Sequence, residues 1–117
     1  MIAVIFEVEP YPEHKNRYLE IAASLKPLLE EIDGFISVER FQSLTNPDKL
    51  LSISFYRDEA ALNEWRNVMA HRKAQTAGRN TLFKDYRLKV LNVIRDYGLT
   101  DRDEAPGDSG GGVRDGV

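Results

Sequence analysis

The sequence predicts a ferredoxin-like α+β domain, in which a four-stranded antiparallel sheet carries two helices on one face. The first observation behind this prediction is the order of patterns along the chain, which is strand, helix, strand, strand, helix, strand. The second is the short polar turn between the two middle strands, which favours an antiparallel hairpin. The third is size, because 117 residues with 42% hydrophobic and 30% charged side chains fit one domain with a modest core.

The first strand and the first helix are predicted from the spacing of apolar residues, which changes from every second residue to every third or fourth. Residues 2–8 alternate, with one side formed by Ile2, Val4, Phe6 and Val8 and the other by Ala3, Ile5 and Glu7. After the turn Pro10-Tyr11-Pro12, apolar residues recur at spacings of three and four, which predicts an amphipathic helix through Tyr18, Ile21, Ala22, Leu25, Leu28 and Ile32. Gly34 stands where that helix should end.

The hairpin and second helix come next. Residues 35–43 and 51–56 alternate on either side of the turn Thr45-Asn46-Pro47-Asp48. Asp58 can accept hydrogen bonds from the free amides of the following helix, whose inward stripe is Ala61, Leu62, Trp65, Val68 and Met69. The apolar stripe is lost after Met69, so His71 falls on a polar extension that ends near Gly78.

A final strand is predicted from about residue 82 to residue 97, with Tyr86, Leu88 and Val90 on one side and Leu91 and Val93 on the other. Beyond Gly98 the chain offers little apolar surface to bury. The sequence therefore predicts a folded domain over residues 1–98 and a flexible polar tail over residues 99–117.

Composition excludes several classes of function. A net charge of -3 with both signs mixed argues against a nucleic-acid partner. The absence of cysteine removes disulfides and thiolate chemistry, and no metal-ligand pair or phosphate-binding glycine loop is present, so neither a metal nor a cofactor is expected. The N-terminus has no basic leader, and its apolar run is too short to span a membrane. A cytoplasmic protein without a membrane partner is the expectation.

The apolar pattern also predicts a homodimer. Two helices cover only one face of a four-stranded sheet, yet the first and last strands are apolar on both sides. Covering each such side chain is worth roughly 1.5–3 kcal/mol, which is large beside a total stability of about 5–15 kcal/mol. Two copies that pack their helix-free faces together would remove this cost.

Several segments resemble the antibiotic biosynthesis monooxygenase (ABM) domain family, and the likeness extends over about residues 1–98. They are Gly34-Phe35-Ile36-Ser37-Val38-Glu39-Arg40-Phe41, Leu50-Leu51-Ser52-Ile53-Ser54-Phe55-Tyr56-Arg57-Asp58-Glu59, Trp65, His71 and Gly78-Arg79. The resemblance implies a dimeric α+β barrel. It also implies one of several activities, because the family includes cofactor-free oxygenases of phenolic polyketides, haem-degrading oxygenases and members with no assigned activity.

Trp65 and His71 are the main candidates for chemistry. Trp65 can be a core residue or a flat wall for an aromatic substrate. His71 can be a solvated surface residue or a general base, since a free imidazole titrates near neutrality. In the quinone-forming members that the chain resembles, a Tyr follows the Trp by six residues and an Asn precedes it by four; here these positions hold His71 and Ala61.

Three further residues are candidates for charge stabilisation. Arg79 and Arg87 can steady an oxyanion, because a guanidinium keeps its charge and donates in a fork, or can form surface ion pairs. Glu7 stands among apolar neighbours and can be a buried acid at a substrate site or an edge residue that leans into water.

The function predicted from these residues is cofactor-independent monooxygenation of a small aromatic phenol or quinol by O2. His71, Trp65 and Arg79 would be catalytic, Trp65 would also shape the pocket, and Arg87 and Glu7 would contact the substrate. Two alternatives remain open. One is a haem-binding or haem-degrading monooxygenase with His71 on the iron, and the other is a small-ligand-binding dimer without turnover.

Overall fold

A computed structural model describes residues 1–75 and 82–107, apart from the side chains of His71 and residues 73–75. The predicted order of elements is confirmed in that range. The elements are β1 (Ile2–Pro10), the short 3-10 helix η1 (Pro12–His14), α1 (Lys15–Glu30), β2 (Phe35–Gln42), β3 (Leu50–Tyr56), α2 (Glu59–Gln75) and β4 (Phe83–Asn92). None of the helices among the described residues is long and apolar enough to cross a lipid bilayer.

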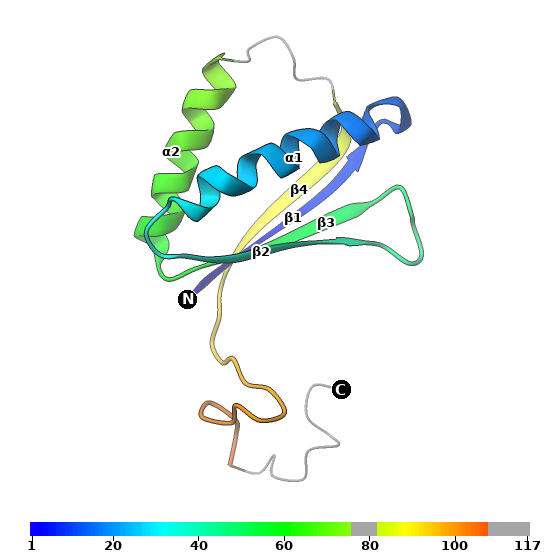
Figure 1. Ribbon diagram of the computed structural model, residues 1–117. Coiled ribbons are helices and arrows are strands. Elements are labelled where there is room, and N and C mark those ends of the chain that lie inside the picture. The colour runs from blue at the N-terminus through cyan, green and yellow to red at the C-terminus, as the bar shows by residue number, and fades with distance from the viewer. Residues whose placement is uncertain (76–81, 108–117) are drawn as a thin grey trace.

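The four strands form one antiparallel sheet in the order β2-β3-β1-β4, and both helices lie on the same side of it (Figure 1). The pairing register assigns every strand residue to a face, because side chains alternate along a strand. The helix side carries the even-numbered residues of β1, from Ile2 to Val8. The helix-free face carries Ala3, Ile5 and Glu7 and, by register, Leu51, Ile53, Phe55, Arg87, Lys89 and Leu91.

Two clusters of buried side chains fill the space between the helices and the sheet. The larger cluster joins β1, β3 and both helices through Ile2, Val4, Leu29, Ile32, Tyr56, Ala61 and Leu62. The smaller lies under the first half of α1 and contains Val8, Tyr18, Ala22 and Leu50. The predicted inward stripe of α2 is thus in the core from Ala61 to Val68, since Trp65 and Val68 also pack against the larger cluster.

The turn between α1 and β2 packs against the start of α2, and both places require particular residues. Gly34 has φ +91, and a Cβ at this position would lie 2.9 Å from the Cβ of Ala61, so only glycine fits without a shift. Asp58 caps α2, because the backbone N–H of Ala61 donates to its Oδ1 at 3.0 Å. That hydrogen bond, with help from Arg57, lowers the pKa of Asp58.

The last strand is shorter than the sequence pattern predicts. β4 ends at Asn92, and the final ladder bond runs from the backbone N–H of Val93 to the carbonyl of Met1 at 3.0 Å. Residues 93–107, here called the C-terminal arm, then extend away from the sheet (Figure 1). The arm takes in residues 99–107 of the predicted tail, and residues 108–117 lie outside the described range.

Candidate functional site

Trp65 lies on the inward side of α2 and is half-buried. It packs against the cluster that contains Ile2 and Val4 of β1, so part of its indole contributes to the core. The capping by Asp58 fixes the start of this helix and thereby the direction in which Trp65 points. Trp65 therefore packs against the core with part of its indole, and the rest of the ring is free to contact a ligand.

The two other residues predicted to be catalytic are only partly covered by the structure. The backbone of His71 belongs to the last turns of α2, but its side chain lies outside the description. Arg79 lies wholly outside the described residues. Their catalytic roles stay predictions.

The helix side of β4 holds an uncovered apolar surface, here called the β4 strip, formed by Tyr86, Leu88 and Val90. The register sets Tyr86 beside Val8, Leu88 beside Phe6 and Val90 beside Val4, all of which face the helices. Yet these three strip residues are 60%, 54% and 50% exposed. Neither helix covers this edge of the sheet, so the strip can accept a ligand.

An aromatic cluster, formed by Phe6, Tyr18, Phe83 and Tyr86, lies at the Tyr86 end of the β4 strip. The ring centroids of Phe6 and Phe83 are 6.0 Å apart, those of Phe6 and Tyr86 are 5.8 Å apart, and those of Phe83 and Tyr86 are 6.1 Å apart. Tyr18 of α1 adds an edge-on contact to Phe83 at 5.6 Å. Aromatic rings in such tilted arrangements stabilise one another and offer ring faces and edges to a further flat molecule.

Arg40 is a polar residue beneath α1 that no pattern in the sequence indicates. Its Nη2 donates to the carbonyl of Ala22 at 3.4 Å, and its Nε is buried without a hydrogen-bond partner among the described residues. Burial raises the pKa of Tyr18, and the guanidinium of Arg40 opposes that shift. Arg40 thus links β2 to α1 and interacts with Tyr18 of the aromatic cluster.

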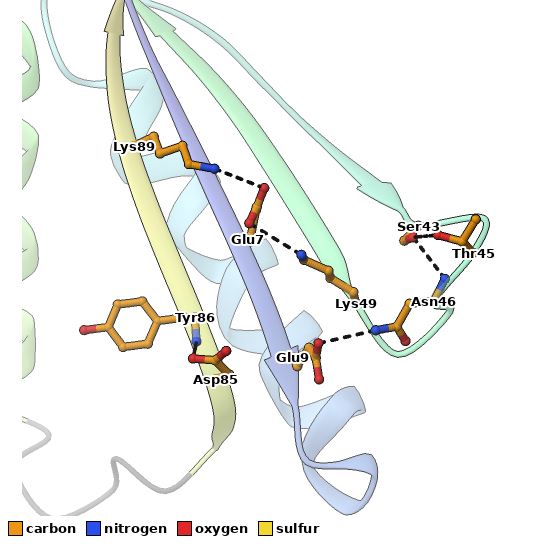
Figure 2. Close-up of polar contacts among 9 residues, drawn as sticks. All are labelled: Glu7, Glu9, Ser43, Thr45, Asn46, Lys49, Asp85, Tyr86 and Lys89. Carbon is orange, nitrogen blue, oxygen red and sulfur yellow. Dashed lines mark hydrogen bonds and ion pairs between the residues drawn. The ribbon is translucent and has the colours of Figure 1, made fainter.

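Glu7 and Arg87, predicted as substrate-binding residues, lie on the helix-free face and not beside Trp65. They are direct neighbours in the register of β1 and β4. Figure 2 shows Glu7 between two lysines, with its carboxylate 3.5 Å from the Nζ of Lys49 and 3.6 Å from the Nζ of Lys89. These two cations lower the pKa of Glu7.

The structure therefore separates the predicted site residues into two groups. Trp65 and the helix that carries His71 are on the helix side, together with the β4 strip. Glu7 and Arg87 are on the opposite face. In the described residues, no three His, Cys, Asp or Glu side chains gather closely enough to hold a metal ion.

Comparison with known proteins settles the family. The sequence model of the antibiotic biosynthesis monooxygenase family matches residues 1–77. The chain belongs to this family. It is similar to a protein named jasmonate monooxygenase ABM from Pyricularia oryzae, with 49% identity over 93 residues. The match covers 80% of this chain but only 43% of that protein, so the chain spans less than half the length of this ABM relative.

Solved structures of similar shape support the ABM fold. Rv0793 from Mycobacterium tuberculosis has a TM-score of 0.70 at 20% identity, over 83% of this chain and 98% of that one. A MhuD variant with two manganese protoporphyrin IX molecules bound per active site has a TM-score of 0.67 at 18% identity, over 84% of this chain and 99% of that one. At these identities the likeness establishes the fold alone.

Proposed function

We propose that this ABM-family chain is a cofactor-independent monooxygenase whose substrate is a small, flat, hydrophobic compound, with a phenol or quinol as the first candidate. The observation that carries the proposal is the β4 strip, because three apolar side chains stand half-exposed beside an aromatic cluster on the side where the helices lie. A hydrophobic ring with few polar groups fits such a surface.

The reaction needs little from the protein beyond binding and proton transfer. His71 accepts the phenolic proton, and the electron-rich anion then transfers an electron to O2. The phenol loses two hydrogen atoms and gains one oxygen atom, and the second oxygen atom leaves as water. Trp65 and the β4 strip hold the ring, and Arg79 steadies the oxyanion.

The jasmonate monooxygenase relative suggests a second candidate substrate. Jasmonate is a small hydrophobic carboxylate, and the identity of 49% favours its inclusion beside the phenols. Its ring and side chain are aliphatic, so they would lie on Leu88 and Val90 rather than stack on Tyr86. The two candidate substrates therefore depend on different ends of the β4 strip.

A second copy of the chain would cover the apolar surface of the helix-free face. On the helix-free face, the side chains of Ile5, Ile53 and Phe55 in the middle of the sheet are only half-buried. Phe41 and Leu91 are exposed on the strands that form its edges. A homodimer that packs these faces together buries this apolar surface and leaves the β4 strip accessible on the outer side of each sheet.

The test of the proposed function is oxygen uptake under labelled O2. Purified chain is given a panel of monophenols, naphthols and hydroquinones, and jasmonate in parallel. We expect uptake with at least one ring substrate and incorporation of one labelled oxygen atom per product molecule. Heat-unfolded protein at the same concentration is the control for spontaneous oxidation.

Other outcomes of the same test would favour haem chemistry or ligand binding without turnover. Uptake that appears only after haemin is added, with a shifted Soret band, replaces the proposal by haem chemistry through His71. Saturable binding of a panel compound without oxygen uptake would mean that the chain binds a small ligand but does not convert it. Either result contradicts cofactor-independent oxygenation.

A further inference from the structure

Two charged side chains of the helix-free face have no hydrogen-bond or ion-pair partner among the described residues. They are Glu39 of β2 and Arg87 of β4, and both are exposed. The other charged side chains of this face have polar partners within the chain; they are Glu7, Glu9, Lys49, Asp85 and Lys89 (Figure 2). A dimer that covers this face must therefore give Glu39 and Arg87 new partners, because an unpaired charge is costly to bury.

Glu39 and Arg87 cannot pair with each other inside one copy. β2 and β4 are the two edges of the sheet, and three strand spacings of about 4.8 Å put them about 14 Å apart. Along the strands they are close, since the register sets Glu39 in one row with Lys89, and Arg87 lies two residues further on. That offset is about 7 Å, which an arginine side chain can span.

The charges of this face alternate from strand to strand. In the sheet order β2-β3-β1-β4, the net charges on the helix-free face are -1, +1, -2 and +1. The residues that give them are Glu39 on β2, Lys49 directly before β3, Glu7 and Glu9 on β1, and Asp85, Arg87 and Lys89 on β4. The face as a whole has little net charge, but a copy of it in reversed strand order is complementary at every strand.

We infer that the two copies of the proposed dimer are related by a two-fold axis parallel to their strands, which pairs Glu39 of each copy with Arg87 of the partner subunit. The inference rests on the homodimer of the proposed function. Facing sheets with aligned strands can have the axis parallel or perpendicular to the strands. The parallel axis reverses the strand order, so that β2 faces β4 and β3 faces β1, and each facing pair has opposite net charges.

The perpendicular axis would have the contrary effect. Each strand would then face the same strand of the partner subunit, and all four facing pairs would have like net charges. Complementary charges fix the orientation of an interface more than they add to its affinity. The parallel axis also places β2 of the partner subunit behind the β4 strip, on the other side of the same strand.

The test exchanges the two charges between copies. Under the parallel axis, the homodimers of Glu39→Arg and of Arg87→Glu each contain two like-charged contacts, whereas both contacts are attractive in a mixed dimer of these variants. Like charges placed together at an interface weaken it at least about tenfold. We therefore expect native mass spectrometry of the mixture to give a ratio of mixed dimer to homodimers at least about tenfold above the statistical ratio. One chain with both substitutions should dimerise like the original chain.

A matched control uses a charge outside the interface. Glu30→Arg, exposed on α1 on the other side of the sheet, is mixed with Arg87→Glu and should give the statistical ratio. Mixing Glu39→Arg with the original chain tests the perpendicular axis. An excess of mixed dimer there would mean that β2 faces β2, and it would contradict the inference.

Two other results separate the orientation from the dimer itself. A statistical ratio for Glu39→Arg with Arg87→Glu, in variants that urea unfolding shows to be folded, removes the parallel axis and leaves the dimer in place. Sedimentation of the original chain as a monomer removes the dimer together with its axis. The oxygen-uptake test of the proposed function is decided independently of both.

Discussion

The variant Phe55→Glu should be monomeric at concentrations at which the original chain is dimeric. Phe55 lies on the helix-free face between Ala3 and Ser37, at the apolar end of the sheet. In the proposed dimer each Phe55 side chain is buried between the two sheets, so the variant buries one charge without a partner in each copy. Each unpaired buried charge costs about 3–5 kcal/mol, and the dissociation constant should rise at least about a thousandfold.

Sedimentation equilibrium measures this change directly. Leu44→Glu is the matched control, because Leu44 is fully exposed at the hairpin between β2 and β3. That variant adds the same charge and should leave the dissociation constant within about a factor of three. Urea unfolding should show that both variants fold. An unchanged dissociation constant for Phe55→Glu would mean that this face is not the interface.

His71→Ala should lose oxygen uptake by about 10²–10⁴-fold, the range typical of a positioned general base. The reason is that the phenol must lose its proton before it can transfer an electron to O2. Activity of the original chain should rise with pH, because only the neutral imidazole accepts a proton. The variant should lack that rise and should regain rate at high pH, where the phenol ionises without help.

His14→Ala is the control for this prediction. His14 ends the short 3-10 helix before α1, and its ring contacts Tyr11 at 6.4 Å between centroids, so its loss changes a surface contact only. Steady-state oxygen uptake over pH 5–9 compares the three proteins. Full activity in His71→Ala, or an equal loss in both variants, would contradict the assigned mechanism.

Most of the fold could be predicted because its signals are local. The alternation in β1, the positive φ of Gly34 at the turn after α1 and the cap at Asp58 each depend on neighbours within a few residues. The end of β4 could not be predicted, since alternation continues past Asn92 while the ladder stops where Val93 bonds to Met1. The contact of Arg40 with Ala22 joins residues 18 positions apart and leaves no periodic trace.

The candidate site could be predicted only in part, for a related reason. Alternation showed that Glu7 points away from its even-numbered neighbours and that Leu88 and Arg87 point to opposite sides. It could not tell which side the helices cover, because both faces of β1 are apolar. The exposure of the β4 strip depends on where the two helices lie across the sheet, and this is a property of tertiary packing rather than of any segment.

The central claim is that substrate binds on the helix side of the sheet, and the adjacent residues Arg87 and Leu88 test it because they lie on opposite faces. Trp65 is the sole tryptophan of the chain, so its fluorescence reports binding nearby. The measurement is a titration of Trp65 fluorescence with the best substrate in Leu88→Gln and Arg87→Gln. We predict a dissociation constant raised about tenfold in Leu88→Gln and unchanged in Arg87→Gln. The reverse pattern would put the substrate on the helix-free face and contradict the account.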